Sequence, residues 1–322
     1  MASGLYLGVD GGGTKTDFVL VDSSGHVLGR CQGATSYYLQ TGFDGLNHVL
    51  KDGVEAVLAA AGRSAGDLAY AFFGLPAHGE DSSVQPLLDV MPEAVLGHRR
   101  YLCGNDMICG WAGSLAGADG INIVAGTGSI GYGERLGRGA RAGGWGEVFS
   151  DEGSAYWIAI QGLAAFARMS DGRLAKGPLH ALLKDHFGLA ADLDLCGKVM
   201  GDGPPSRDQI AALSQHVAKA AQGGDTTARA IFARAGQELA DMIAAIHRAL
   251  GYAPGETVRV SYSGGIFNCG ALILDPLRAG LPQACRLETP ILPPGIGAAL
   301  YAARLAGEPL APEALDRLRT YA

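Results

Sequence analysis

Residues 8–22 read GVDGGGTKTDFVLVD, in which three glycines stand between two runs rich in apolar and β-branched residues. The runs at 5–9 and 16–22 are typical of strands, so the glycines predict a tight turn between them. Because glycine has no Cβ, the backbone N–H groups of such a turn can approach phosphate oxygens closely. Thr14 adds a hydroxyl, and the carboxylate of Asp10 at the strand end can face a hydrated Mg²⁺. The stretch predicts a phosphate-binding hairpin, and a plain glycine turn fits the same pattern.

The chain continues as an alternation of helix and strand. Apolar residues from Leu46 onward keep the helical period, and they are followed by the strand-like run at 70–77. A further strand near 100–103 precedes a helix at 107–115, after which the strand INIVA at 121–125 opens a second unit. We therefore expect an open α/β architecture whose second half repeats the first in outline.

The second unit has a glycine turn of its own, GTGSIG at 126–131. Gly126, Gly128 and Gly131 satisfy the G-x-G-x-x-G pattern of dinucleotide-binding folds, but that pattern must open a helix. Here the following residues are glycine-rich and strand-like, so a second phosphate-binding hairpin is the better interpretation. Helices are then expected at about 152–169 and 229–250, and the segment 258–268 is expected to form a strand, a glycine turn and a helix start.

Asn105 and Asp106 follow directly after a predicted strand. A carboxylate at the carboxyl edge of an α/β sheet, where ligands collect, can accept the proton of a hydroxyl that attacks a phosphoryl group. An ordinary helix N-cap is the alternative for an isolated Asn-Asp pair.

Residues 143–146 read GGWG and are followed by SDEGS at 150–154. An aromatic side chain among glycines with carboxylates nearby suits a sugar, whose ring face stacks and whose hydroxyls need acceptors. Capping of the next helix by Ser150 or Asp151 is the structural alternative. The turn at Gly264 and Gly265 could let adenosine lie against bare backbone, although one glycine turn is a weak signal.

Composition limits the functional classes. The 322 residues are enough for about two domains, and the net charge of −7 with a pI near 5.6 argues against nucleic acid or an acidic membrane surface as a partner. The six cysteines form no CxxC pair, which favours reduced thiols, and no apolar stretch is long enough to span a membrane. A cytoplasmic protein is expected.

Five motifs in this order resemble the N-acetylglucosamine kinase branch of the actin-like sugar kinases, the family that also contains the BadF/BcrA-type ATPases. They are GVDGGGTKTDFVLVD, GNDMICGWAG, NIVAGTGSIGYG, GGWGEVFSDEGSAYWIAIQGL and YSGGIFNCG, at 8–22, 104–113, 122–133, 143–163 and 262–270. The resemblance implies an α/β protein of two ribonuclease-H-like (actin-like ATPase) domains around an interdomain cleft. The expected domains are 1–118, joined by a C-terminal helix at about 295–322, and the larger, more helical 119–294.

The resemblance also implies an ATP- and Mg²⁺-dependent kinase that phosphorylates the 6-hydroxyl of N-acetylglucosamine, with Asp106 as the general base. A small-molecule sugar is then the partner, and a homodimer would be in keeping with the relatives. Carried over residue by residue, the resemblance assigns ATP to Gly12, Gly13, Thr14, Thr127, Gly128, Gly264 and Gly265, magnesium through water to Asp10, and the sugar to Asn105, Asp106, Gly144, Trp145 and Asp151.

One departure from the family pattern keeps the choice of sugar open. Mammalian-type N-acetylglucosamine kinases carry a sugar-contacting asparagine in the loop after the third strand, where an ungapped alignment places Tyr37 in this chain. Glucosamine kinases vary in the same loop and are the first alternative. An ATPase that activates a partner reductase or dehydratase through a shared iron–sulfur cluster is the alternative of another class, and it needs cysteines at a dimer interface. The burial expected for Cys103 and Cys109 disfavours it.

Overall fold

The computed structural model describes residues 4–201, 203–253 and 255–321, and the chain divides into two compact units. Unit 1 runs to Gly120 and resumes at Thr289, so it is built from both ends of the chain. Unit 2 is the continuous segment Ile121–Glu288.

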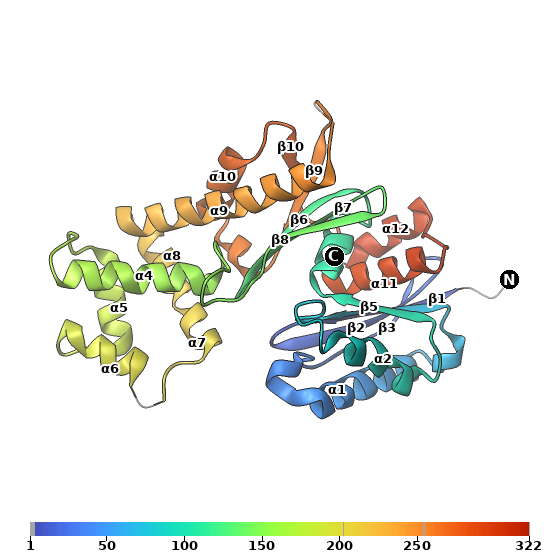
Figure 1. The fold of residues 1–322 in the computed structure, drawn as a ribbon. Helices are drawn as coiled ribbons and strands as arrows, with labels where there is room; N and C mark the ends of the chain where they lie inside the picture. Colours follow the sequence, from blue (N-terminus) through green and yellow to red (C-terminus); the bar gives the residue numbers. More distant parts are fainter. Residues whose placement is uncertain (1–3, 202, 254, 322) are drawn as a thin grey trace. The chain divides into compact units, whose positions relative to one another are not determined.

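Unit 1 contains a five-stranded sheet with the strand order β3-β2-β1-β4-β5 (Figure 1). The first three strands are antiparallel neighbours, whereas β4 and β5 continue the sheet in parallel with β1. The expected strand–glycine turn–strand opening is therefore confirmed. The strands are β1 (Leu5–Gly11), β2 (Lys15–Asp22), β3 (Val27–Ala34), β4 (Tyr70–Leu75) and β5 (Tyr101–Asn105).

Helices cover both faces of this sheet because its strands are apolar on both sides. Leu5 and Leu7 of β1 are buried in one cluster with Leu50 of α1, whereas Tyr6 between them belongs to a second cluster with Ala298 of α11. Successive strand residues point to opposite faces, which explains the two clusters. The helices are α1 (Tyr38–Ala60), α2 (Gln85–Leu96), α3 (Met107–Ser114), α11 (Pro294–Leu305) and α12 (Pro312–Leu318), with 3-10 turns at Ala65–Asp67 and Arg319–Tyr321.

Unit 2 repeats the sheet of unit 1. Its order is β10-β9-β6-β7-β8, so from the opposite edge β8-β7-β6-β9-β10 corresponds to β3-β2-β1-β4-β5. The β7–β8 pair is antiparallel, while β9 lies parallel to both β6 and β10. A hairpin follows the glycine turn at 126–128 where a dinucleotide site would require a helix, which confirms the predicted hairpin. The strands are β6 (Gly120–Ala125), β7 (Ser129–Arg135), β8 (Arg138–Gly143), β9 (Val258–Ser263) and β10 (Cys285–Leu287).

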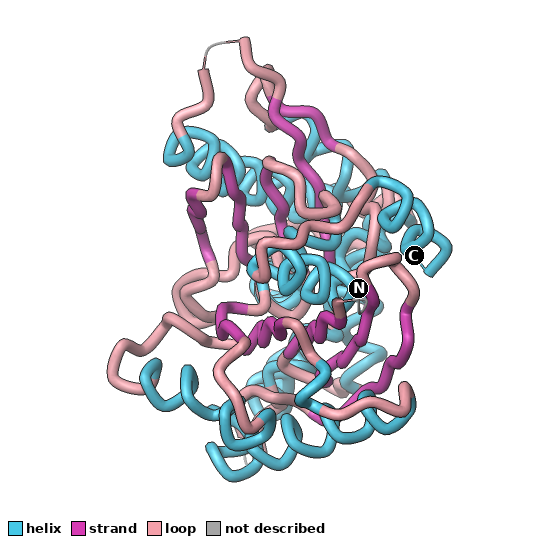
Figure 2. Tube along the Cα trace, turned by 90° about the vertical axis from the view of Figure 1, so that its right-hand side faces the viewer, coloured by secondary structure: helices cyan, strands magenta, loops and turns pink. Residues whose placement is uncertain are grey.

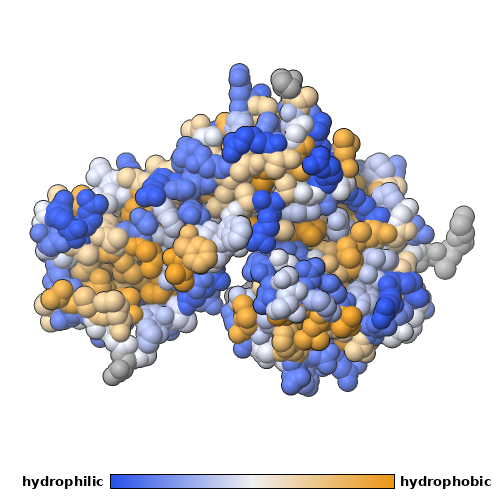
Figure 3. All heavy atoms as spheres, in the orientation of Figure 1, coloured by the Kyte–Doolittle hydropathy of each residue, from blue (hydrophilic) through white to orange (hydrophobic). Residues whose placement is uncertain are grey.

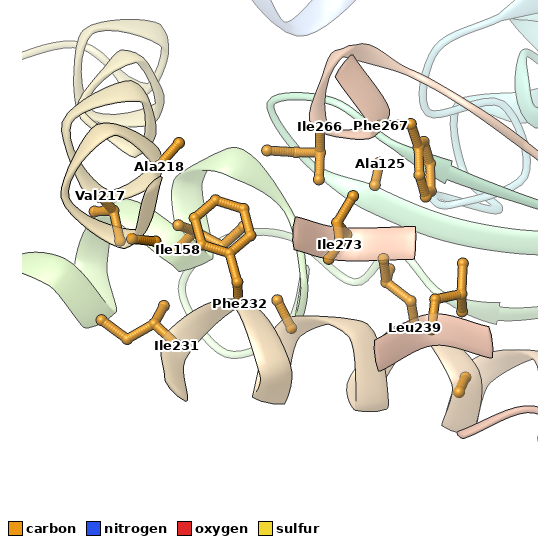
Figure 4. Close-up of a cluster of buried hydrophobic side chains, with 14 of the residues drawn as sticks. Ala125, Ile158, Val217, Ala218, Ile231, Phe232, Leu239, Ile266, Phe267 and Ile273 are labelled. Carbon is orange, nitrogen blue, oxygen red and sulfur yellow. The ribbon is translucent and has the colours of Figure 1, made fainter. Parts of the chain in front are cut away.

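Unit 2 is built around the long helix α9, which keeps its apolar residues on one buried stripe. Phe232, Leu239 and Ile243 are fully buried, and Figure 4 shows Phe232 among Ile158 and Val217 from neighbouring helices. The helices are α4 (Ala155–Ser170), α5 (Pro178–Phe187), α6 (Leu195–Met200), α7 (Arg207–Ala212), α8 (Ser214–Gln222), α9 (Thr226–Leu250) and α10 (Ala271–Gly280), with 3-10 turns at Asp192–Asp194 and Gly265–Cys269.

Two capping expectations are corrected by the structure. Helix α4 begins at Ala155, and its N-cap is Ser154, whose hydroxyl accepts a hydrogen bond from the Trp157 N–H at 3.1 Å. The expectation that Ser150 or Asp151 caps this helix is wrong, because the chain makes a further turn before the helix starts. Asp106 does occupy the N-cap position of α3, but its side chain makes no capping hydrogen bond.

The elements and surface of each unit can be followed in two further views. Figure 2 distinguishes strands from helices, and Figure 3 shows hydrophobic side chains interspersed with hydrophilic ones on its visible face. Among the described helices, none combines the length and the apolar character that crossing a bilayer requires.

Candidate active site

In unit 1 the predicted site residues gather at the carboxyl edge of the parallel strands. Asp10 of β1 is in register with Gly74 of β4, which in turn is in register with Gly104 of β5. Asn105 ends β5, and Asp106 follows it. This edge is where ligands bind in open α/β sheets.

The side chain of Asn105 organises the end of its strand. Its Oδ1 accepts a hydrogen bond from the Met107 N–H at 3.2 Å, and its Nδ2 donates one to the His78 carbonyl at 3.2 Å. Asn105, and not Asp106, therefore provides the side-chain hydrogen bond to the backbone at the start of α3. The carboxylate of Asp106 is not used for capping.

Asp10 is a half-buried carboxylate with other carboxylates around it. Burial, together with the charges of Asp106 and Asp17, raises the pKa of Asp10 to about 8. The Cys109 thiol hydrogen-bonds Asp10 and partly offsets this effect. A cation at this edge would relieve the repulsion among the three carboxylates.

Space around this edge is tightly filled by small residues. A Cβ at Gly74 would collide with the Cys109 sulfur and would lie 3.2 Å from the Asp106 Cα. Cys109 is fully buried, and its thiol also donates to the Val9 carbonyl at 3.6 Å. Position 74 must therefore be glycine for the strand end to fit against helix α3.

The predicted phosphate turn joins β1 to β2. Its Gly12 N–H donates to the Lys15 carbonyl at 2.8 Å, and the Thr35 hydroxyl donates to the Gly12 carbonyl at 2.7 Å. A Cβ at Gly13 would have no neighbour within 4 Å, so the tip of the turn is open. Thr14 lies directly before β2 and is exposed. The turn has the open backbone that a phosphate would need.

The residues of unit 1 fit a hard cation. Asp10, Asp17 and Asp106 offer the oxygen donors that Mg²⁺ prefers, and Mg²⁺ commonly takes only one or two carboxylates and completes its shell with water and substrate phosphates. Over the described residues, no group of three or more His, Cys, Asp or Glu side chains forms a metal cage. Asp10 would hold the ion, with phosphate oxygens and water supplying other ligands.

In unit 2 a second set of predicted residues meets at the corresponding edge of its sheet. The turn after β6 is closed by the Gly126 N–H, which donates to the Gly128 carbonyl at 2.9 Å. Gly264, at a φ of +106°, follows the neighbouring strand β9, and a Cβ there would collide with the backbone of Ala125. The Thr127–Gly128 turn and the Gly264–Gly265 turn therefore lie side by side.

A pocket of about 660 Å³ adjoins these turns, which is within the usual size range of small-molecule sites. Thr127 and Gly265 line it. Most of its other lining residues come from helices that the sequence did not mark as functional. They contribute Asp208, Ala211 and Ala212 of α7 and Ser214, Gln215, Ala218, Lys219 and Gln222 of α8.

The predicted sugar-contacting residues of unit 2 share one loop between β8 and α4. Gly144 has a φ of +70°, which a side chain would strain, and a Cβ there would also press on Ile130. Trp145 is 72% exposed, so its indole is available to a ligand. Asp151 is 3% exposed and has a φ of +59°. Burial raises the pKa of Asp151, and Arg207 partly offsets that effect.

Two charged residues at the start of α7 escaped the sequence reasoning. Arg207 Nη2 donates to Asp151 Oδ2 at 2.6 Å, and the Thr127 hydroxyl donates to Asp208 Oδ1 at 3.2 Å. The sequence contained one usable signal, the capping box of Ser206 and Gln209, which marks a helix start here. That signal does not indicate the partner of either residue. Asp151 lies 56 residues before Arg207, and Thr127 lies 81 residues before Asp208.

The sequence pattern of the BadF/BadG/BcrA/BcrD ATPase family matches residues 7–302, nearly the whole chain. This chain belongs to that family. Within the BadF/BadG/BcrA/BcrD ATPase family, the match includes both glycine turns, Asp106 and the loop that carries Asp151. The predicted family membership is confirmed.

Among its relatives, this family member is 29% identical to an N-acetyl-D-glucosamine kinase of Dictyostelium discoideum over 94% of this chain and 98% of the relative. It is 28% identical to an N-acetylmuramic acid/N-acetylglucosamine kinase of Clostridium acetobutylicum over 84% and 88% of the two chains.

Solved structures agree on the fold of this ATPase-family member. A Chromobacterium violaceum protein assigned as an N-acetylglucosamine kinase has a TM-score of 0.71 at 28% identity, covering 92% of this chain and 98% of its own. A ROK family glucokinase of Streptomyces griseus, with glucose and AMPPNP, has a TM-score of 0.57 at 19% identity, covering 98% and 100%. The predicted α/β fold with two actin-like units is confirmed.

Proposed function

We propose that this protein is an ATP-dependent kinase of N-acetylglucosamine that phosphorylates the 6-hydroxyl with Asp106 as general base. The single observation that carries the proposal is the placement of Asp106 beside Asp10 at the carboxyl edge of the first sheet. The kinases of Dictyostelium and Clostridium support the substrate class, since both are named for N-acetylglucosamine and both align over most of this chain. We further propose that the two compact units are the domains expected at 1–118 with 295–322 and at 119–294.

Asp106 has the chemistry that the base requires. Its carboxylate makes no capping hydrogen bond to α3, and it lies at the end of a strand that Asn105 holds in place. A sugar hydroxyl becomes nucleophilic as its proton passes to such a carboxylate. Its oxygen then bonds to the γ-phosphorus of ATP while the bond from that phosphorus to the β–γ bridging oxygen breaks, and ADP leaves. Asn105 would contact the sugar as well as fix the base.

Backbone and hydroxyl donors would hold the phosphates of ATP. We assign Gly12, Gly13 and Thr14 to one set and Thr127 with Gly128 to the other. Magnesium, when bound through Asp10, supplies charge neutralisation for the phosphate oxygens. Positioned donors of this kind stabilise the charge that spreads over the transferring phosphoryl group.

The nucleoside would occupy the pocket of unit 2. Gly265 and Thr127 line this pocket, and Gly264 places its backbone beside them. Polar side chains at Gln215 and Lys219 line the same space and offer hydrogen bonds to a base or ribose. We assign adenosine to this pocket on these grounds.

The sugar would be contacted in unit 2 by Gly144, Trp145 and Asp151. An exposed indole can stack on the apolar face of a pyranose ring, and a carboxylate accepts hydrogen bonds from its hydroxyls. Tyr37 in unit 1 is the residue that would determine specificity for N-acetylglucosamine or glucosamine. Its backbone N–H donates to the Thr35 hydroxyl at 3.1 Å, and Thr35 also bonds the phosphate turn.

The partner-activating ATPase is a weaker candidate. Such a protein must present thiolates to an iron–sulfur cluster at a subunit interface. Cys103 and Cys109 are buried, and burial raises the pKa of both thiols, so neither is suited to that task.

An ADP-release assay with ATP and Mg²⁺ tests the proposal. N-acetylglucosamine, glucosamine, N-acetylmannosamine, N-acetylmuramic acid and glucose are supplied at equal concentrations, and the product is analysed for phosphate on O6. We expect N-acetylglucosamine to stimulate ADP release most strongly. ATP hydrolysis that no sugar changes would overturn the proposal and leave the partner-activating ATPase.

A further inference from the structure

The strongest unassigned feature of unit 2 is the ion pair between Arg207 and Asp151. Arg207 is the first residue of α7, whereas Asp151 lies in the loop before α4. Their side chains meet at 2.6 Å, and Arg207 Nε also lies 3.2 Å from Glu147 Oε2 in the same loop. One guanidinium thus bridges two carboxylates four residues apart.

Asp151 depends on this partner. Its side chain is only 4% exposed, so its negative charge is largely removed from water, and a buried charge is costly unless it is paired. The Gly146 N–H also bonds the carboxylate. The backbone of Asp151 lies at a positive φ, which a non-glycine residue adopts only when its surroundings enforce it. The loop therefore needs a strong interaction to hold this conformation.

The ion pair between Arg207 and Asp151 connects this loop to helix α7. A second bond from the same helical turn, between Asp208 and the Thr127 hydroxyl, ties the phosphate turn to α7 as well. The ion pair also packs against that turn, because a Cβ at Gly128 would lie 2.6 Å from both Arg207 Nη2 and Asp151 Oδ2. The guanidinium consequently contacts the loop and the phosphate turn together.

We infer that Arg207 is a positioning residue, which fixes the Asp151 carboxylate and the loop 143–153 in the conformation that receives the sugar. This inference rests on the proposed function for the sugar itself. The effect of Arg207 on the loop can be measured without any sugar present. Arg207 would touch neither the sugar nor the reacting phosphate in this role. Lysine could keep the charge but could not bridge Glu147 and Asp151 with one planar group.

The first test is amide hydrogen exchange of the full-length protein. We expect Arg207→Gln to speed exchange in residues 146–154, where the Ser150 and Ser154 N–H groups bond within the loop. Arg173→Gln is the matched control, because it breaks an exposed ion pair with Asp171 in the same unit. Equal exchange in the wild type and Arg207→Gln would overturn the inference. If Arg207→Gln does not fold, Arg207→Lys is measured instead.

The second test separates positioning from general loss of structure. In the sugar-dependent assay we expect Arg207→Gln to raise the KM for the sugar by about 10- to 100-fold. The KM for ATP should rise by a clearly smaller factor, because the Thr127–Asp208 hydrogen bond still holds the phosphate turn. Arg207→Lys should recover part of the loss. Equal increases in both KM values would indicate a merely structural role and overturn the inference.

The two proposals can fail separately. A wild-type protein that no sugar stimulates would refute the proposed function, while faster loop exchange in Arg207→Gln would still support the positioning role. An active wild type with an unaltered Arg207→Gln variant would refute the positioning role alone.

Discussion

At the scale of single residues, the proposed chemistry depends on carboxylates whose surroundings differ. Asp10 is half-buried with Asp17 and Asp106 nearby, and a bound cation would offset the negative charge of these carboxylates. Asp151 is buried against a guanidinium and is already neutralised within its unit. The same side-chain type can therefore serve a metal in one place and a neutral sugar in another.

Asp106→Asn tests the base directly. Asparagine keeps the size of the side chain but cannot accept the proton, so we expect kcat to fall by about 10²- to 10⁴-fold. Nucleotide binding, followed by calorimetry with a non-hydrolysable ATP analogue, should stay within about 3-fold of the wild-type value. Asp119→Asn, which lies outside the proposed site, should leave turnover unchanged. Full turnover in Asp106→Asn would remove this residue from the proposed mechanism.

At the scale of elements, the close approach of α11 to α3 is a specific packing feature. A Cβ at Gly297 of α11 would collide with the Gly113 and Cys109 backbones of α3. Gly297→Ala should therefore push the helices apart, with an expected loss of about 1–3 kcal/mol in the free energy of unfolding.

Gly197→Ala is the matched control for that substitution. Gly197 lies in α6, and a Cβ there would meet nothing within 4 Å. Alanine should then stabilise the helix by up to about 1 kcal/mol, because it has the higher helix propensity. Urea unfolding of both variants should give shifts of opposite sign. A stabilised Gly297→Ala variant would contradict the packing account.

A charge cluster joins α5 to the turn that follows it. Asp192 accepts from Lys176 Nζ at 2.7 Å and from Lys184 Nζ at 3.0 Å, and His180 Nε2 lies 2.9 Å away. These partners hold the pKa of Asp192 well below its usual range, with the Lys176 hydrogen bond as the largest cause. The depressed pKa means that the folded state favours the ionised form.

Asp192→Asn should therefore lower the melting temperature at pH 7. A depressed acid pKa stabilises the fold above the unfolded value of about 4, and this stabilisation is lost progressively as the pH falls below that value toward the lower folded pKa. The difference in Tm between the wild type and Asp192→Asn should shrink over that range. A difference that stays constant from pH 7 to pH 3 would show that the ion pairs do not cause it.

The elements differ in how far the sequence could predict them. The turns at 11–14 and 126–128 were predictable because glycine clusters between apolar runs have few other uses. The start of α4 was misplaced because Ser150, Asp151 and Ser154 are all acceptable caps, and only the path of the loop selects Ser154. Arg207 was missed because it acts through its ion pair with Asp151, 56 residues earlier, and local sequence patterns do not reveal such a contact.

At the scale of the whole molecule, the same sheet order occurs twice, but the two units are assembled from different parts of the chain. In both sheets an antiparallel hairpin meets parallel strands, and the glycine turn lies between the first two strands. Unit 2 is continuous along the chain, whereas unit 1 recovers its last helices from the C-terminal segment after Thr289. Unit 1 therefore cannot complete its core until the end of the chain is available.

Truncation tests this dependence. A chain that ends at Glu288 lacks α11, so Tyr6 and Phe72 would lose the covering of Ala298 and Ala302. We expect that chain to aggregate or to lose the cooperative unfolding of unit 1, because an uncovered apolar sheet face favours association.

The matched control is a chain that ends at Leu310, which keeps α11 and lacks α12. It loses the fully buried Leu318, a side chain whose burial contributes about 1.5–3 kcal/mol. We therefore expect it to fold with a lower Tm, between the full-length chain and the shorter truncation. Soluble yield, near-ultraviolet circular dichroism and thermal unfolding compare the three. If the chain ending at Glu288 unfolded cooperatively at the full-length Tm, the sheet face under α11 would not need its helix, and unit 1 would be complete without the C-terminal segment.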